Sequence, residues 1–381
     1  MISYVLYDIL YLYMATSFIN SITSLVKSFL QPKDSSLVVT GIDIGSSSIK
    51  LVEMSIKSGH LVLNNYGSIA LGPYAKSPIG TTPVLTSEIV SQALVELFNE
   101  TKANKNNIVA SLPTGSSLFK DITIPAGIND EEAKTVVMTE AHRVIPVPIQ
   151  DVDIDWLSIP NEILPEEEVD ISRKSFLLIA VSHESQKRIE SYMHGAEISP
   201  TVYELEVFSS MRSIYTHERA PIALVDLGAS HIKVSIIHEG VMRRAVALDR
   251  GFNELENSLV VNGTDFVLAR KIKHSSSITG LSNEEKSFRD TYLSLIKDVQ
   301  VVTNEYERYS HTSISRVVLL GGGAEMKNII EYTESIIGIP TEKSKPFAQT
   351  IVPEIVKDVI TEIEPEFTIA TGLALRILTN S

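Results

Sequence analysis

The sequence contains no cysteine, and its basic residues are outnumbered by acidic ones. Without cysteine the chain can form neither disulfide bonds nor thiolate metal sites. Its 33 lysine and arginine residues face 47 aspartate and glutamate residues, which gives a net charge of −14 at pH 7. A protein that binds nucleic acid needs clustered basic residues. The composition therefore argues against a nucleic-acid partner.

Uninterrupted apolar runs of membrane-spanning length are also absent. Such a helix needs about 20 predominantly apolar residues, whereas serine, threonine and asparagine interrupt the apolar stretch between residues 16 and 28. From Met14 onward apolar residues recur at helical spacing. We therefore expect residues 1–35 to form an N-terminal extension with an amphipathic helix. That helix could pack on protein, lie on a membrane surface or span the membrane, and Met14 could be the true start.

The length of 381 residues favours two to four domains. Hydrophobic periodicity predicts an α/β protein. The first half opens with three strands, a helix and a further strand. The second half restarts after Pro221 with three strands, three helices, a strand and a final helix. The predicted ranges are strands 38–44, 49–56, 61–70, 107–112, 222–226, 232–238, 241–248 and 315–320, and helices 86–101, 283–309 and 364–378.

A separate α/β unit interrupts the first half. A strand at 120–124 precedes a helix at 130–144, whose start is marked by Asn129 and Glu132 at capping-box spacing. Two more strands and a helix at 184–194 follow. We expect this inserted subdomain to span residues 109–197.

One motif occurs twice. The stretch "IDIGSSSIKLVEM" begins at residue 42 and "VDLGASHIKVSII" at residue 225. In register, Asp43 matches Asp226, Gly45 matches Gly228, Ser47 matches Ser230 and Lys50 matches Lys233. A strand, a glycine turn and a second strand expose backbone N–H groups that bind anions, and serine hydroxyls add donors. A single copy is a weak signal, but two copies predict hairpins that hold nucleotide phosphates from both sides.

Carboxylates and a glycine-rich turn complete the predicted site. Asp43 and Asp226 precede the two turns, where carboxylates can hold Mg²⁺, usually through its bound waters. In "VVLLGGGAEM" a buried strand opens into a helix through three glycines. Glycines at such a turn let the backbone approach a ribose or base closely. The three motifs together predict a site for a nucleotide and Mg²⁺.

These motifs resemble those of the actin-like ATPase superfamily, which includes actin, sugar kinases, FtsA and MreB. The resemblance implies a duplicated actin-like (ribonuclease H-like) fold with one phosphate hairpin from each half. It assigns nucleotide binding to Asp43, Gly45, Ser46, Ser47, Ser48, Lys50, Asp226, Gly228, Ala229, Ser230, Lys273, Gly321, Gly322, Gly323 and Ala324.

The inserted unit resembles that of the type IV pilus assembly protein PilM family. The similar segments are "LPTGSSLFKDITIP", from residue 112, and "EAHRVIPVPIQDVDIDW", from residue 140. The resemblance implies an ATP-binding adaptor on the cytoplasmic face of the inner-membrane platform that assembles type IV pili, or of a related type II secretion platform. Its partner would be the cytoplasmic tail of a PilN-like membrane protein, with pilus motor ATPases and the platform protein as further candidates. It leaves open a dimer or a polymer.

The resemblance also implies subdomain limits. The first actin-like subdomain would comprise residues 36–108, 198–219 and 346–381, and the second residues 220–250 and 312–345. A helical subdomain, residues 251–311, would close the nucleotide cleft.

The chain departs from the pattern in "LARKIKH", from residue 268, where Arg270 replaces an expected glutamate. An arginine cannot accept hydrogen bonds from ribose hydroxyls, so nucleotide affinity could be reduced. Glu140 is a candidate for orienting water in hydrolysis, although a structural carboxylate is the stronger interpretation. We expect slow or absent hydrolysis. The alternatives are an FtsA-like division anchor, a small-molecule kinase and a scaffold that no longer binds ATP.

Overall fold

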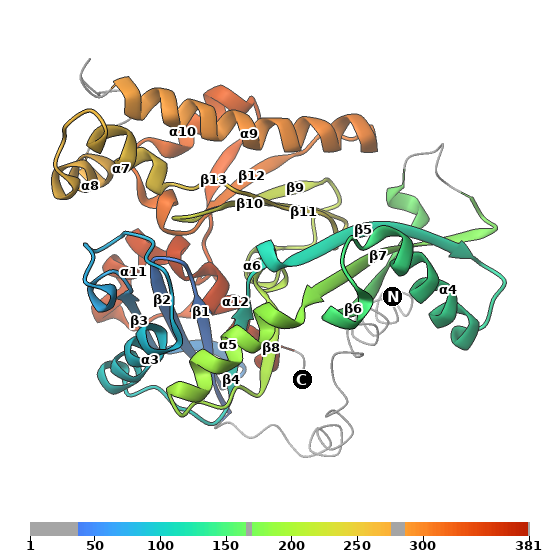
Figure 1. Cartoon of the computed structure of the whole chain (residues 1–381), viewed down its shortest axis with the longest axis horizontal. Helices are drawn as coiled ribbons and strands as arrows, with labels where there is room; N and C mark the ends of the chain where they lie inside the picture. Colours follow the sequence, from blue (N-terminus) through green and yellow to red (C-terminus); the bar gives the residue numbers. More distant parts are fainter. Residues whose placement is uncertain (1–36, 165–169, 276–285, 380–381) are drawn as a thin grey trace.

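Three β-sheets form the framework of the protein, seen in the computed structural model of Figure 1. The structure describes residues 37–164, 170–275 and 286–379. The amphipathic helix expected near the N-terminus lies outside these residues. Within them, no helix combines the length and apolar composition of a membrane span.

The first sheet has six strands in the order β14-β3-β2-β1-β4-β8. β1, β2 and β3 are antiparallel neighbours, whereas β4 lies parallel to β1 and β8 parallel to β4. The strands are β1 (Val38–Ile44), β2 (Ser48–Lys57), β3 (His60–Ala70), β4 (Ile108–Leu112), β8 (Val202–Leu205) and β14 (Thr350–Ile351). The predicted hairpins of this half are therefore confirmed to within a residue or so.

Helices from both ends of the sequence pack on this sheet. α12 contacts β1 and β2, while α3 contacts β3 and α5. The contact is closest at Gly41 of β1, where a Cβ atom would overlap the backbone oxygen of Ala370. The helices are α3 (Ser87–Thr101), α5 (His183–Gly195), α6 (Glu206–Ile214), α11 (Lys357–Ile363) and α12 (Thr368–Leu378). The final helix is shorter than the predicted range 364–378, because residues 364–367 form a 3-10 turn, η10 (Glu364–Phe367).

The second sheet repeats the hairpin of the first. Its order is β11-β10-β9-β12-β13, and Asp226 pairs with Lys233 across β9 and β10 as Asp43 pairs with Lys50 across β1 and β2. The strands are β9 (Ile222–Leu227), β10 (Ile232–His238), β11 (Val241–Leu248), β12 (Arg316–Leu320) and β13 (Thr341–Lys343). The described helices of this half are α7 (Asn253–Val260), α8 (Phe266–Ser275), α9 (Lys286–Ser310) and α10 (Ile329–Ile337).

The inserted unit has its own antiparallel sheet, which lies to the right in Figure 1. The order is β5-β7-β6, and a separate hydrophobic core joins this sheet to α4. Its elements are β5 (Ser117–Pro125), α4 (Asp130–Val144), β6 (Val152–Ile159) and β7 (Arg173–Ser182). The expected capping box of Asn129 and Glu132 is present at the start of α4.

The inserted sheet occupies less of the sequence than expected. Residue 109 lies in β4, which is a strand of the first sheet, and α5 packs against α3 of the first subdomain. Strand pairing between distant segments, rather than order along the chain, decides which sheet a strand joins. We therefore place the inserted subdomain at residues 117–182 instead of 109–197.

Two chain segments connect the first and second sheets. Residues 215–221 lead from α6 to β9, and residues 344–349 lead from β13 back to β14. α6 and α12 cross at close range, since a Cβ atom on Gly372 would overlap the backbone of Ser209.

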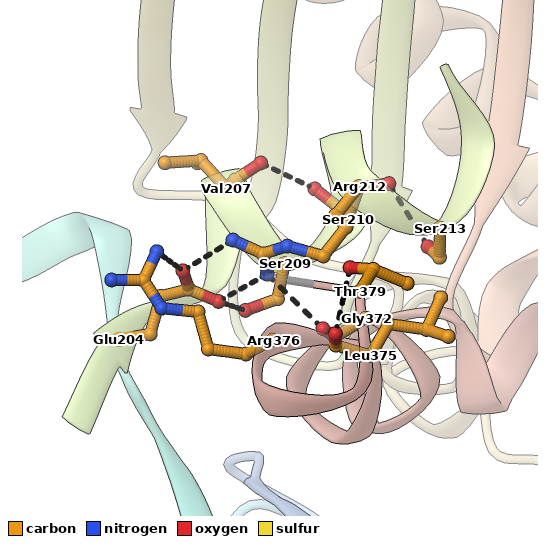
Figure 2. Close-up of polar contacts among 10 residues, drawn as sticks. All are labelled: Glu204, Val207, Ser209, Ser210, Arg212, Ser213, Gly372, Leu375, Arg376 and Thr379. Carbon is orange, nitrogen blue, oxygen red and sulfur yellow. Dashed lines mark hydrogen bonds and ion pairs between the residues drawn. The ribbon is translucent and has the colours of Figure 1, made fainter. Parts of the chain in front are cut away.

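A buried ionic cluster holds this crossing together (Figure 2). The Glu204 carboxylate accepts hydrogen bonds from Arg212 at 2.6 and 2.7 Å, from Arg376 at 2.9 Å and from Ser209 at 2.6 Å. Arg212 also donates to the carbonyl of Gly372 at 3.1 Å. Burial by itself would raise the pKa of Glu204. The charges of Arg212 and Arg376 outweigh burial, so the pKa of Glu204 lies below its ordinary value. One carboxylate therefore ties β8 and α6 to α12.

Candidate functional site

A cavity of about 870 Å³ lies between the first and second sheets. Both hairpin turns and the glycine turn line it. The predicted residues on its surface are Asp43, Gly45, Ser46, Ser47, Ser48, Lys50, Asp226, Gly228, Ala229, Lys273, Gly321, Gly322 and Gly323. The sequence motifs that predicted phosphate binding thus meet in one place.

Three predicted residues do not line this cavity. Ser230 and Ala324 flank the second hairpin and the glycine turn without being part of its wall. Glu140 lies on α4 of the inserted subdomain, where it forms an ion pair with Arg143 at 3.0 Å. Because its carboxylate is not on the cavity surface, we discard Glu140 as a catalytic candidate.

The first hairpin places a poorly compensated carboxylate at the cavity. Burial raises the pKa of Asp43 to about 6, although the Lys50 charge opposes this change. The Ser111 hydroxyl donates to the Asp43 carboxylate at 3.1 Å. The Lys50 ammonium lies 3.5 Å from Glu366. Asp43 is therefore a carboxylate that would gain from a nearby cation.

The second hairpin is arranged differently. The Lys233 ammonium donates to Asp226 at 3.0 Å and to Glu206 at 2.8 Å. The backbone N–H of Thr114, in the 3-10 turn η2 (Thr114–Ser116), donates to the other oxygen of Glu206 at 2.6 Å. Burial opposes the charge on Lys233, but Asp226 and Glu206 together outweigh burial and raise the pKa of Lys233 above its ordinary value.

The glycine turn requires glycine at its first position. Gly321 has a φ of +81°, and a Cβ atom there would overlap the carboxylate of Asp226. A Cβ atom on Gly323 would meet the ring of Phe252. Glu325, at the end of the 3-10 turn η8 (Gly322–Glu325), also lines the cavity, and burial raises the pKa of Glu325 to about 7.

Two residues of α8 that the sequence analysis named, Arg270 and Lys273, line the cavity. Lys273 lines the cavity and forms a buried ion pair with Glu256 at 2.9 Å. Burial lowers the pKa of Lys273, although Glu256 opposes this effect. Arg270 lies against Gly80, where any Cβ atom would overlap its guanidinium group.

A loop of the first subdomain reaches across to this side. We call residues 72–86 the strap. Besides the contact of Gly80 with Arg270, Thr82 accepts a hydrogen bond from Asn253 of α7 at 3.1 Å. Strap residues Gly80, Val84 and Leu85 line the cavity. The strap thus connects the first subdomain to the helices of the second half beside the cavity.

Sequence reasoning missed Glu206, Glu325, Glu366 and the strap. Lys233 was visible in the repeat, as the counterpart of Lys50, but no local pattern indicates its partner Glu206. The strap carries glycine and proline, which predict only a loop.

The residues present suit a phosphate ligand better than a free metal. Backbone N–H groups and serine hydroxyls at the hairpin turns, together with Lys50, can bind phosphate oxygens. Within the described ranges, no group of three or more histidine, aspartate or glutamate side chains could hold a metal ion. A cation here would therefore share its coordination between Asp43 and a bound phosphate.

Comparison with known proteins gives a family and a fold. The family model of the type IV pilus assembly protein PilM matches residues 41–378. A solved PilM-PilN type IV pilus biogenesis complex aligns with a TM-score of 0.73 and 20% identity, over 91% of this chain and 99% of that one. MreB5 of Spiroplasma citri bound to ADP aligns with a TM-score of 0.52 and 10% identity, over 91% and 98% of the two chains. The fold is the duplicated actin-like ATPase fold.

Proposed function

The chain belongs to the type IV pilus assembly protein PilM family, and from this premise we propose that it is a nucleotide-binding adaptor of a type IV pilus assembly platform. It binds the cytoplasmic tail of a PilN-like membrane protein and lies on the inner face of the cytoplasmic membrane. The observation that carries the proposal is the similarity, over 91% of the chain, to a structure described as a PilM-PilN complex.

The cavity supports the nucleotide part of this proposal. Two hairpin turns from the two halves face one space of about 870 Å³, which is large enough for a nucleoside triphosphate. Asp43 is placed to hold Mg²⁺ that enters with the phosphates, and bound Mg²⁺ would screen phosphate charge.

The inserted subdomain contacts the second half, which supports coupling between nucleotide and partner. Arg243 of β11 is 1% exposed and pairs with Asp121 of β5 at 3.0 Å. Just before the inserted subdomain, a Cβ atom on Gly115 of η2 would lie 3.8 Å from the side chain of Ala247 of β11. Closure of the cavity would move the second half, and the contact between β11 and the inserted subdomain would therefore shift as well. Coupling requires that the partner bind the open and closed forms with different affinity.

The binding test uses a fluorescent peptide with the sequence of the PilN-like tail from the same genome. We expect its anisotropy to rise on titration with the whole chain, while a scrambled peptide of the same composition stays unbound. A tail that binds no better than the scrambled peptide would contradict the adaptor function.

The coupling makes a separate prediction. The Asp121→Asn variant should bind the tail, but the effect of ATP on tail affinity, which we expect to be about fivefold or more in the unsubstituted chain, should shrink. Glu305→Gln is the matched control, because Glu305 pairs with the neighbouring Arg244 at 3.2 Å in an exposed ion pair. Equal ATP effects in Asp121→Asn and Glu305→Gln would show that the Asp121–Arg243 pair carries no coupling.

A further inference from the structure

The two hairpins carry the same aspartate and lysine in the same register, yet the two lysines have different partners. Asp43 pairs with Lys50 across β1 and β2, and Asp226 with Lys233 across β9 and β10. The Lys50 ammonium lies next to Glu366, 3.5 Å away. The Lys233 ammonium instead contacts its own aspartate. The duplication is therefore electrostatically asymmetric.

Lys233 already occupies the space between two carboxylates. Its ammonium lies 3.0 Å from Asp226 and 2.8 Å from Glu206, and these three side chains are 19%, 13% and 7% exposed respectively. A divalent cation placed between the same two carboxylates would lie a few ångströms from a buried positive charge. Repulsion at that distance is strong in a partly buried setting.

One of the two remaining carboxylate oxygens is also engaged. The second oxygen of Glu206 accepts the N–H of Thr114 at 2.6 Å. Oδ1 of Asp226 lies against Gly321, where a Cβ atom would overlap it. Both oxygens of Glu206 thus already accept protein donors, while Oδ1 of Asp226 faces the glycine turn.

We propose that Lys233 takes the place of a divalent cation at the second hairpin, so that Mg²⁺ entering with a nucleotide is held from the first hairpin by Asp43, without Asp226. This differs from the sequence-based expectation that both aspartates serve Mg²⁺. The inference rests on the proposed nucleotide function, but its first test needs no nucleotide.

The first test titrates the chain with Mn²⁺ alone and follows free Mn²⁺ by electron paramagnetic resonance. Removing the lysine charge in Lys233→Met leaves Asp226 and Glu206 without a counter-cation, so we expect Mn²⁺ to bind about tenfold or more tighter than in the unsubstituted chain. The double variant Lys233→Met/Asp226→Asn should lose this gain. Equal Mn²⁺ binding by the unsubstituted chain and Lys233→Met would overturn the inference.

A second test does not depend on the folding of Lys233→Met. Asp226→Asn and Asp43→Asn are compared in the unsubstituted background, as the ratio of ATP affinities with Mg²⁺ and with EDTA. We expect Asp226→Asn to keep this ratio and Asp43→Asn to bring it close to one. A ratio that collapses in Asp226→Asn would overturn the inference. If no form binds ATP, the proposed function fails, and the Mn²⁺ titration still decides the role of Lys233.

Discussion

Replacing Glu204 by alanine is expected to lower the free energy of unfolding by about 3–5 kcal/mol. The change leaves Arg212 and Arg376, 18% and 19% exposed, facing each other without their shared carboxylate at the crossing of α6 and α12. Breaking one partner of a buried ionic cluster leaves uncompensated charge. Urea denaturation of the two forms, followed by circular dichroism, measures the difference.

Two comparisons make this result specific. Arg143→Ala, which breaks the more exposed Glu140–Arg143 pair on α4, should change the stability by less than about 1 kcal/mol. The effect of Glu204→Ala should also shrink at low pH. The pKa of Glu204 lies below its ordinary value of 4.5 in the folded chain, because Arg212 and Arg376 outweigh burial. The stabilisation is thus present above pH 4.5 and disappears as the pH falls through the folded pKa. A loss of stability no larger than that of Arg143→Ala would contradict the role of the cluster.

Asp43→Asn should have opposite effects on the free protein and on its nucleotide complex. In the free protein, burial raises the pKa of Asp43 from 3.8 to about 6. The charged carboxylate therefore costs folding free energy as the pH rises from 3.8 through 6. A difference of two pKa units corresponds to about 3 kcal/mol at most. We expect the isosteric asparagine to stabilise the free chain above pH 6 and to have little effect near pH 4.

In the nucleotide complex we expect the same substitution to be unfavourable. ATP with Mg²⁺ at a hundredfold excess over its dissociation constant should stabilise the unsubstituted chain by about 2.7 kcal/mol, seen as a rise in Tm. In Asp43→Asn the part of the rise that depends on Mg²⁺ should disappear. Thermal unfolding with ATP or ADP, with Mg²⁺ or with EDTA, separates these contributions, and Asp226→Asn serves as the matched control. No shift in the unsubstituted chain at millimolar nucleotide would favour a scaffold that has lost ATP.

The local parts of this architecture follow from the sequence, because their signals lie within a few residues. The alternation of apolar residues and the glycine turns predicted both hairpins, and the repeat placed Asp43 and Asp226 in equivalent positions. The capping box at Asn129 marked the start of α4 correctly. In each case the residues that determine the structure are neighbours in the chain.

Contacts between distant segments could not be predicted in this way. The repeat identifies Lys233 as the counterpart of Lys50. Its second partner, Glu206, belongs to α6, and their contact depends on where α6 packs. Arg270 meets Gly80 across the cavity, and neither residue has a neighbour that indicates the other. The sheet to which β4 belongs is decided by its pairing with β1, and this is why the structure places β4 in the first sheet and not in the sheet of the inserted subdomain.

The packing of α12 on β1 at Gly41 sets an order for folding during synthesis. Residues 222–343 form the second sheet and its helices from one continuous stretch, so this part can acquire its core as it leaves the ribosome. The first sheet needs β14 and α12 from residues beyond 349, although β1 begins at residue 38. The half that is made first must therefore wait, with apolar strands uncovered, until residues 368–378 have been synthesised. Apolar strands that stay uncovered during translation raise the risk of aggregation.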